Sequence, residues 1–224
     1  SYVDKASEKK VVSALRKLLP EAGFIAEEGS AAYSDETYCW VVDPLDGTTN
    51  YIHDNAPYCV SIALRDKQSL LLGVVYEPCR DECFYAWKGG GAYVNGERLR
   101  VSLVSEPKDA FVVTELPYNF EQYARTGEHL IHELYGKVAG IRMTGSAALA
   151  ICYIAAGRFD GWLEAFLGKW DYSAAALIVL EAGGKVTDFY GNDYFMDGHH
   201  IVATNGLLHP IFLNLIKEVP PLDM

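Results

Sequence analysis

Two aspartates separated by two residues follow an apolar segment of this 224-residue chain. Residues 39–42 are apolar at every position, so we expect a buried strand, with Asp43 where solvent first reaches it. Pro44 fixes φ and lacks an N–H group, so it should end the strand and turn the Leu45 carbonyl and the Asp46 carboxylate backward. Three hard oxygen ligands would then converge, and such ligands suit Mg²⁺ or Mn²⁺.

The next four residues, Gly47-Thr48-Thr49-Asn50, are typical of the first turn of a short helix. Free N–H groups and a partial positive charge at a helix start favour phosphate binding. The metal ion and the phosphate would therefore bind side by side at the turn formed by residues 43–50. In isolation, an Asp-Pro-x-Asp-Gly segment is more often only a capped turn, so this interpretation needs support from the rest of the chain.

Two further carboxylates give that support. Glu27 follows a short apolar strand at residues 23–26, and Asp171 stands at the start of an apolar helix. With Asp43 and Asp46 they would bring about four negative charges together, which two divalent cations would balance. The alternative for Asp171 is an ordinary cap of its helix.

Three blocks of the sequence resemble the inositol monophosphatase family of Mg²⁺-dependent, lithium-sensitive phosphatases. They are Ala26-Glu27-Glu28-Gly29, the run from Asp43 to Asn50, and Trp170-Asp171-Tyr172-Ser173-Ala174 continuing to Val186. The resemblance extends over nearly the whole chain and implies an α+β fold, a layered α–β–α–β–α sandwich. It also implies two bound Mg²⁺ ions, a weak third site, and Mn²⁺ as a substitute.

The resemblance also assigns roles to individual residues. It implies that the metal ligands are Glu27, Asp43, the Leu45 carbonyl, Asp46 and Asp171, with Asp43 bridging the two ions. Thr48, partnered by Asp4, would contact the attacking water together with Glu27. The substrate would be met by Gly47, Thr48, Gly145, Ser146, Ala147 and Glu164. For Glu164 the alternative is an exposed charge at a sheet edge.

The implied reaction is hydrolysis of inositol 1-phosphate and related myo-inositol monophosphates by metal-activated water. Fructose-1,6-bisphosphatase and 3′(2′),5′-bisphosphate nucleotidase activities of the same superfamily stay open, as does a non-catalytic, metal-binding regulatory role. The nucleophile loop of haloacid-dehalogenase phosphatases also contains Asp-Gly-Thr. Its two aspartates are one residue apart, however, whereas Pro44 and Leu45 both lie between Asp43 and Asp46.

Composition restricts the partners and the location. A net charge of −11 disfavours nucleic-acid binding, so the expected partner is a small phosphorylated polyol or sugar. No segment approaches the ~20 apolar residues of a membrane span, and the N-terminus lacks the features of a signal peptide. We therefore expect a cytoplasmic protein, and the resemblance favours a homodimer.

The cysteines and histidines suggest no second metal site. The five cysteines form no Cys-x-x-Cys pair and are expected to be reduced. A zinc site at Cys79, Cys83 and His53 is disfavoured, since residues 80–82 look like a hairpin turn. We expect the adjacent pair His199-His200 to lie in a solvent-facing loop.

Periodicity predicts two halves within one compact unit. In residues 1–105 we expect a helix at 5–19, an antiparallel sheet with strands at 60–64, 70–76 and 82–87, and a hairpin at Asn95-Gly96. This half carries the main metal motif. In residues 106–224 we expect an α/β arrangement that supplies Asp171 and the substrate contacts, with a strand at 111–114 and helices at 121–138, 146–156, 171–182 and 207–217.

Overall fold

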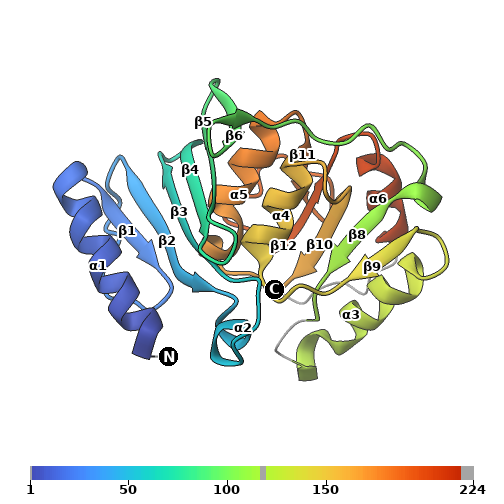
Figure 1. The fold of residues 1–224 in the computed structure, drawn as a ribbon, viewed down its shortest axis with the longest axis horizontal. Helices are drawn as coiled ribbons and strands as arrows, with labels where there is room; N and C mark the ends of the chain where they lie inside the picture. The colour runs from blue at the N-terminus through green and yellow to red at the C-terminus, as the bar shows by residue number, and fades with distance from the viewer. Residues whose placement is uncertain (1, 117–119, 218–224) are drawn as a thin grey trace.

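Two β-sheets face each other across a pair of helices in the computed structural model of the chain, which describes residues 2–116 and 120–217 (Figure 1). Helices α4 (Ala147–Ala155) and α5 (Lys169–Glu181) lie between the sheets. Helix α1 (Tyr2–Leu18) covers the outer face of the first sheet, and α3 (Phe120–Leu134) and α6 (His209–Leu215) cover that of the second. The predicted α–β–α–β–α layering is therefore confirmed.

The first sheet contains seven strands in chain order. They are β1 (Gly23–Ala26), β2 (Cys39–Asp46), β3 (Cys59–Arg65), β4 (Leu70–Glu77), β5 (Glu82–Trp87), β6 (Gly91–Val94) and β7 (Glu97–Arg98). The strands predicted at 60–64, 70–76 and 82–87 correspond to β3, β4 and β5, which are antiparallel as expected. At the edge of the sheet, β1 runs parallel to β2. The predicted hairpin is confirmed: Asn95 and Gly96, with φ of 48° and 88°, join β6 to β7 in the left-handed conformation that a tight turn requires.

Strand β2 does not end at Pro44, contrary to the prediction. All eight of its residues are buried, and it continues to Asp46 through a register shift between Asp43, which pairs with Ser61, and Asp46, which pairs with Cys59. This bulge leaves Pro44 outside the ladder, where its missing N–H group is tolerated. The bulge, rather than a strand end, therefore brings the two aspartates to the same place.

The second sheet has the strand order β11-β12-β10-β8-β9. Its strands are β8 (Phe111–Thr114), β9 (Gly140–Arg142), β10 (Gly161–Ala165), β11 (Lys185–Asp188) and β12 (His200–Thr204). Strand β8 runs parallel to both of its neighbours, and β12 runs antiparallel to both of its own. Helix α3 ends at Leu134 rather than at residue 138, because Gly136 takes the left-handed conformation that stops a helix.

The two central helices are buried on almost every side, which explains their alanine-rich, unbroken apolar sequence. Gly73 on β4 allows α5 to approach the first sheet, since a Cβ atom there would overlap the Ala174 carbonyl oxygen. Helix α5 consequently contacts β2, β3 and β4 and brings its first turn towards the end of β2.

The first sheet takes its strands from residues 23–98 and the second from residues 111–204. Helices α4 and α5 nevertheless pack on both sheets, so the division into residues 1–105 and 106–224 stays a prediction. None of the helices in the described ranges is long and apolar enough to cross a membrane.

Candidate active site

A pocket of about 300 Å³ brings together all but one of the predicted site residues. Its wall includes Glu27, Asp43, Leu45, Asp46, Gly47, Thr48, Gly145, Ser146, Ala147, Glu164 and Asp171. The exception, Asp4 on α1, lies behind the wall and reaches it through Thr48. Segments far apart in the chain, from both sheets and from α2 (Thr48–Ile52), thus contribute to one cavity.

Asp46 is held in place from the second half of the chain. Its Oδ2 accepts hydrogen bonds from Ser146 Oγ at 2.6 Å and from the Ala148 N–H at 2.8 Å. Burial raises the pKa of Asp46 to about 6, although these hydrogen bonds act in the opposite direction. One oxygen of this carboxylate is therefore fixed at the start of α4.

The acidic groups of the pocket disfavour one another's ionised form. Burial raises the pKa of Asp43 well above its usual range, and the charges of Asp46 and Glu27 raise it further. Burial, with the charge of Asp46, raises the pKa of Asp171 to about 8. Burial also raises the pKa of Glu27, whose hydrogen bond with Asp43 partly offsets the effect. A bound cation would relieve this repulsion.

The oxygen donors fit a hard cation that is only partly coordinated by protein. Within residues 2–116 and 120–217, no three His, Cys, Asp or Glu side chains are arranged to hold a metal ion by themselves. Mg²⁺ commonly binds through one or two carboxylates and retains waters or substrate oxygens as further ligands. The carboxylates, the Leu45 carbonyl and a phosphate could together supply such a shell, so the metal roles of the individual residues stay a prediction.

Thr48 lies where it could orient a water molecule. Its Oγ1 is 2.8 Å from Asp4 Oδ1 and 3.0 Å from the Leu45 carbonyl oxygen, and its single proton can be donated to either acceptor. The lone pairs of Oγ1 remain available to accept a hydrogen bond from a water molecule. Gly47 makes this turn possible, because its φ of 89° is left-handed and a Cβ there would be 2.9 Å from the Pro57 carbonyl oxygen.

Asp171 is both a helix cap and a pocket residue, so the two alternatives for it coexist. The Gly168 N–H donates to Asp171 Oδ2 at 2.7 Å at the start of α5, and the same carboxylate lines the cavity. The second oxygen is therefore the one available to a ligand.

Glu164 is not at a sheet edge, so that alternative is wrong. It lies on β10, between β8 and β12, and its Oε2 is buried without a hydrogen-bond partner among the described residues. Burial raises its pKa well above the usual range, and the charge of Glu115 adds to the effect. Such a group can exchange hydrogen bonds with a hydroxyl-bearing ligand.

Glu115 and Asn50 were missed as site residues. Glu115 Oε1 accepts from the Thr144 N–H at 2.5 Å and from the Gly145 N–H at 2.9 Å, and Asn50 Nδ2 donates to the Thr144 carbonyl at 2.8 Å. Together they hold the Thr144–Gly145 peptide, which lies just ahead of Ser146. A signal for Glu115 exists in the sequence, because it follows an apolar strand just as Glu27 does.

The other singled-out residues lie outside the pocket. All five cysteines are free thiols, and Cys79 is exposed in the turn between β4 and β5. The prediction that His200 lies in a loop is wrong, because this residue begins β12. His199 is exposed, with Nδ1 2.7 Å from the Leu167 carbonyl oxygen.

Comparisons with known proteins agree with this geometry. Residues 1–220 match the model of the Inositol monophosphatase family. The Nus factor SuhB of Escherichia coli K12 is 44% identical over 91% of this chain and 76% of that protein. Inositol monophosphatase 2 of Solanum lycopersicum is 42% identical over 96% of this chain and 84% of that protein. The solved inositol monophosphatase of Anabaena superposes with a TM-score of 0.91 at 37% identity, over 98% of this chain and 87% of that one.

The family match spans nearly all of the chain, and the superposition extends over both sheets. The predicted resemblance and fold are therefore confirmed, and the chain belongs to the inositol monophosphatase family.

Proposed function

We propose that the protein is a Mg²⁺-dependent phosphomonoesterase that hydrolyses inositol 1-phosphate and similar polyol monophosphates. The main support is the charge of the pocket wall, which among the described residues contains six carboxylates and no Lys, Arg or His. The carboxylates are Glu27, Asp43, Asp46, Glu115, Glu164 and Asp171. A phosphate can enter such a cavity only together with cations, because anions of like charge repel strongly where water is excluded.

In this proposal Glu27, Asp43, the Leu45 carbonyl, Asp46 and Asp171 hold two Mg²⁺ ions, and Mn²⁺ can substitute. The bound cations would offset the phosphate charge and lower the pKa of a coordinated water. A third, weak site remains part of the proposal.

The residues of the chain perform the proton transfer and the orientation. Thr48 accepts a hydrogen bond from the attacking water and passes its own proton towards Asp4, 2.8 Å away. Glu27 also lines the pocket and can accept a hydrogen bond from the same water, whose one transferred proton goes through Thr48 to Asp4. The departing alkoxide takes up a proton from solvent water. No Ser, Cys or His side chain is needed as a covalent nucleophile in this arrangement.

The remaining lining residues of the pocket favour an uncharged, hydroxyl-rich leaving group. Glu164 and Glu115 line the pocket together with the exposed side chains of Leu116 and Phe166. Carboxyl groups exchange hydrogen bonds with ring hydroxyls but repel a second phosphate. This favours inositol monophosphates over fructose 1,6-bisphosphate and adenosine 3′,5′-bisphosphate, both of which carry two phosphates.

A cytoplasmic location, expected from the sequence composition, completes the proposal together with a homodimer and lithium sensitivity, which are carried over from the family resemblance.

Phosphate release from the three candidate substrates tests the proposed function. We expect Mg²⁺-dependent release from inositol 1-phosphate that is abolished by chelator. Its kcat/KM should be at least about tenfold above that for either bisphosphate, because the second phosphate of a bisphosphate would lie near the carboxylates of the pocket. Asp43→Asn should abolish both turnover and stabilisation by Mg²⁺. Preference for a bisphosphate, or a fully active Asp43→Asn variant, would contradict the assignment.

Thr48→Ala separates the catalytic role of the threonine from metal binding. Loss of the hydroxyl should lower kcat by about 100-fold, the usual scale for a group that assists proton transfer, while the rise in melting temperature with Mg²⁺ is unchanged. Thr37→Ala, at an exposed position outside the pocket, is the matched control and should behave as wild type. Loss of the Mg²⁺ effect in Thr48→Ala would show that the residue is needed for metal binding.

The raised pKa values predict how pH changes the need for metal. An unfolded aspartate loses its proton near pH ~4, whereas folded Asp46 and Asp171 retain theirs up to pH values of about 6 and about 8, so without metal the free energy of unfolding falls as pH rises through this range. The gain in melting temperature from Mg²⁺ over chelator should therefore be larger near pH ~8 than near pH ~5. An equal gain in melting temperature at both pH values would refute the binding of Mg²⁺ by these carboxylates.

A second candidate function comes from the names of the bacterial relatives. Several, including the protein of Escherichia coli, are Nus factors. A similar factor role for this chain would have to accommodate its net charge of −11, which disfavours direct contact with a nucleic-acid backbone. We therefore expect any such role to use protein partners.

Replacement in Escherichia coli tests the factor role, by asking whether this chain relieves defects of cells that lack their own SuhB. Relief by both wild type and Asp43→Asn would support a factor function independent of hydrolysis. Fluorescence anisotropy with labelled RNA at ~0.15 M salt should show no binding. Tight RNA binding would contradict the charge argument.

A further inference from the structure

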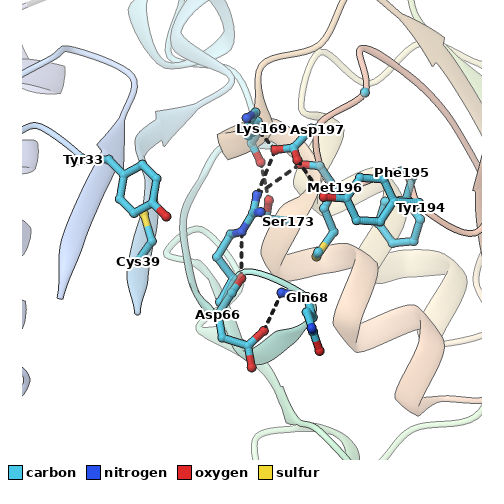
Figure 2. Close-up of polar contacts among 12 residues, drawn as sticks. Tyr33, Cys39, Asp66, Gln68, Lys169, Ser173, Tyr194, Phe195, Met196 and Asp197 are labelled. Atoms are coloured by element: carbon cyan, nitrogen blue, oxygen red, sulfur yellow. Dashed lines mark hydrogen bonds and ion pairs between the residues drawn. The ribbon is translucent and has the colours of Figure 1, made fainter. Parts of the chain in front are cut away.

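The segment at residues 195–199, between β11 and β12, lies along the start of α5 (Figure 2). The Leu167 N–H donates to the His199 carbonyl at 2.9 Å, and His199 Nδ1 is 2.7 Å from the Leu167 carbonyl oxygen. Because a carbonyl only accepts, this nitrogen must carry the proton. The Tyr172 hydroxyl lies 2.9 Å from the Gly198 carbonyl oxygen. Contacts on both sides of Asp171 are thus made by one short segment.

Asp197 makes the ionic contacts of this segment. Its Oδ1 is 2.6 Å from Nζ of Lys169, two residues before Asp171 (Figure 2). The same oxygen is 3.1 Å from Arg65 Nη1. Its Oδ2 accepts from the Tyr194 hydroxyl at 3.1 Å. Burial acts against ionisation, but the hydrogen bonds from Lys169 and Arg65 prevail and lower the pKa of Asp197 to about 2. The carboxylate therefore stays ionised at any physiological pH.

Arg65 connects these contacts to the first sheet. It is the last residue of β3 and is only 9% exposed. Its Nε donates to the Asp66 carbonyl at 3.2 Å and its Nη1 to the Met196 carbonyl at 3.4 Å. Its Nη1 also donates to the carboxylate of Asp197, which supplies the negative charge for this buried guanidinium. Removing one partner of such a pair is costly, because the other charge is left buried and uncompensated.

The first turn of α5 is therefore held between the two sheets, and Asp197 contacts it through Lys169. An ordinary exposed ion pair would contribute little. Here, however, one carboxylate joins β3, the 195–199 segment and the residue that begins α5. This turn carries Asp171, one carboxylate oxygen of which already accepts a hydrogen bond from the Gly168 N–H, so a shift of the turn moves the remaining oxygen within the pocket.

We propose that Asp197, joined to Arg65 and Lys169, is a positioning residue for Asp171 and thereby for the second divalent cation. The proposal rests on the proposed function, which makes Asp171 a ligand of that cation. Outer partners that orient a metal ligand typically change metal affinity by about 10- to 100-fold when they are lost. Asp197 touches neither substrate nor cation in this proposal, so its effect should appear in metal affinity before it appears in the maximal rate.

Mn²⁺ titration of Asp197→Asn by calorimetry and electron paramagnetic resonance tests the proposal. We expect the weaker of two Mn²⁺ dissociation constants to rise about tenfold and the Mg²⁺ concentration for half-maximal rate to rise in parallel, with kcat at saturating Mg²⁺ within about threefold of wild type. Asp193→Asn is the matched control, because Asp193 lies in the same connection and pairs with Lys185 at the surface. It should bind Mn²⁺ as wild type does.

A double-mutant cycle asks whether the effect passes through Asp171. In an Asp171→Asn background, Asp197→Asn should change Mn²⁺ affinity no further, since the group it positions is already altered. Asp197→Glu, which keeps the charge, should recover part of the affinity and serves if the asparagine variant is unstable. Wild-type Mn²⁺ affinity in Asp197→Asn, or an equal additional loss in the Asp171→Asn background, would overturn the proposal.

Failure of the proposed function would be seen separately. It would appear as a wild-type protein without Mg²⁺-dependent turnover, while the Mn²⁺ titrations would still decide the positioning role.

Discussion

Repulsion among closely placed carboxylates is the constraint on which the rest of the structure depends. Asp43 and Asp46 are buried at a bulge in β2, and Glu27 and Asp171 add charge beside them. Raised pKa values at all four positions show that the fold alone does not stabilise their ionised forms. Bound cations stabilise the folded protein with these carboxylates ionised, and this stabilisation matters most at neutral pH. The same cations would also allow a phosphate to enter the cavity.

The layers of the fold hold this cluster from several directions. The β2 bulge sets the spacing of its two aspartates, and the start of α4 fixes one oxygen of Asp46. Helix α5 approaches the first sheet over Gly73 and brings Asp171 opposite them. Glu115 and Asn50 hold the peptide before Ser146 from opposite sides. No single element could place these groups, so the site depends on the contact between the two sheets and the helices between them.

Local pattern predicted the parts of the site that follow from local chemistry. Most elements, and the gathering of polar groups around the Asp43–Asn50 segment, could be read from apolar runs and from turn residues such as Asn95-Gly96, because these depend on neighbours in sequence. The layering was implied by the family resemblance. Pro44 was misjudged because a bulge depends on the partner strand β3. The place of Glu164 on a central strand could not be predicted, because strand order in the second sheet is a long-range property. Arg65 and Asp197, 132 residues apart, gave no local signal at all.

The most direct test of the account is the location of Mn²⁺ by anomalous diffraction from crystals of the protein grown with that ion. Two anomalous peaks are expected in the pocket, both in contact with Asp43, one also beside Glu27 and the other beside Asp46 and Asp171. No peak in the pocket, or ions bound away from Asp43, would contradict the claim that this carboxylate cluster exists to hold two cations.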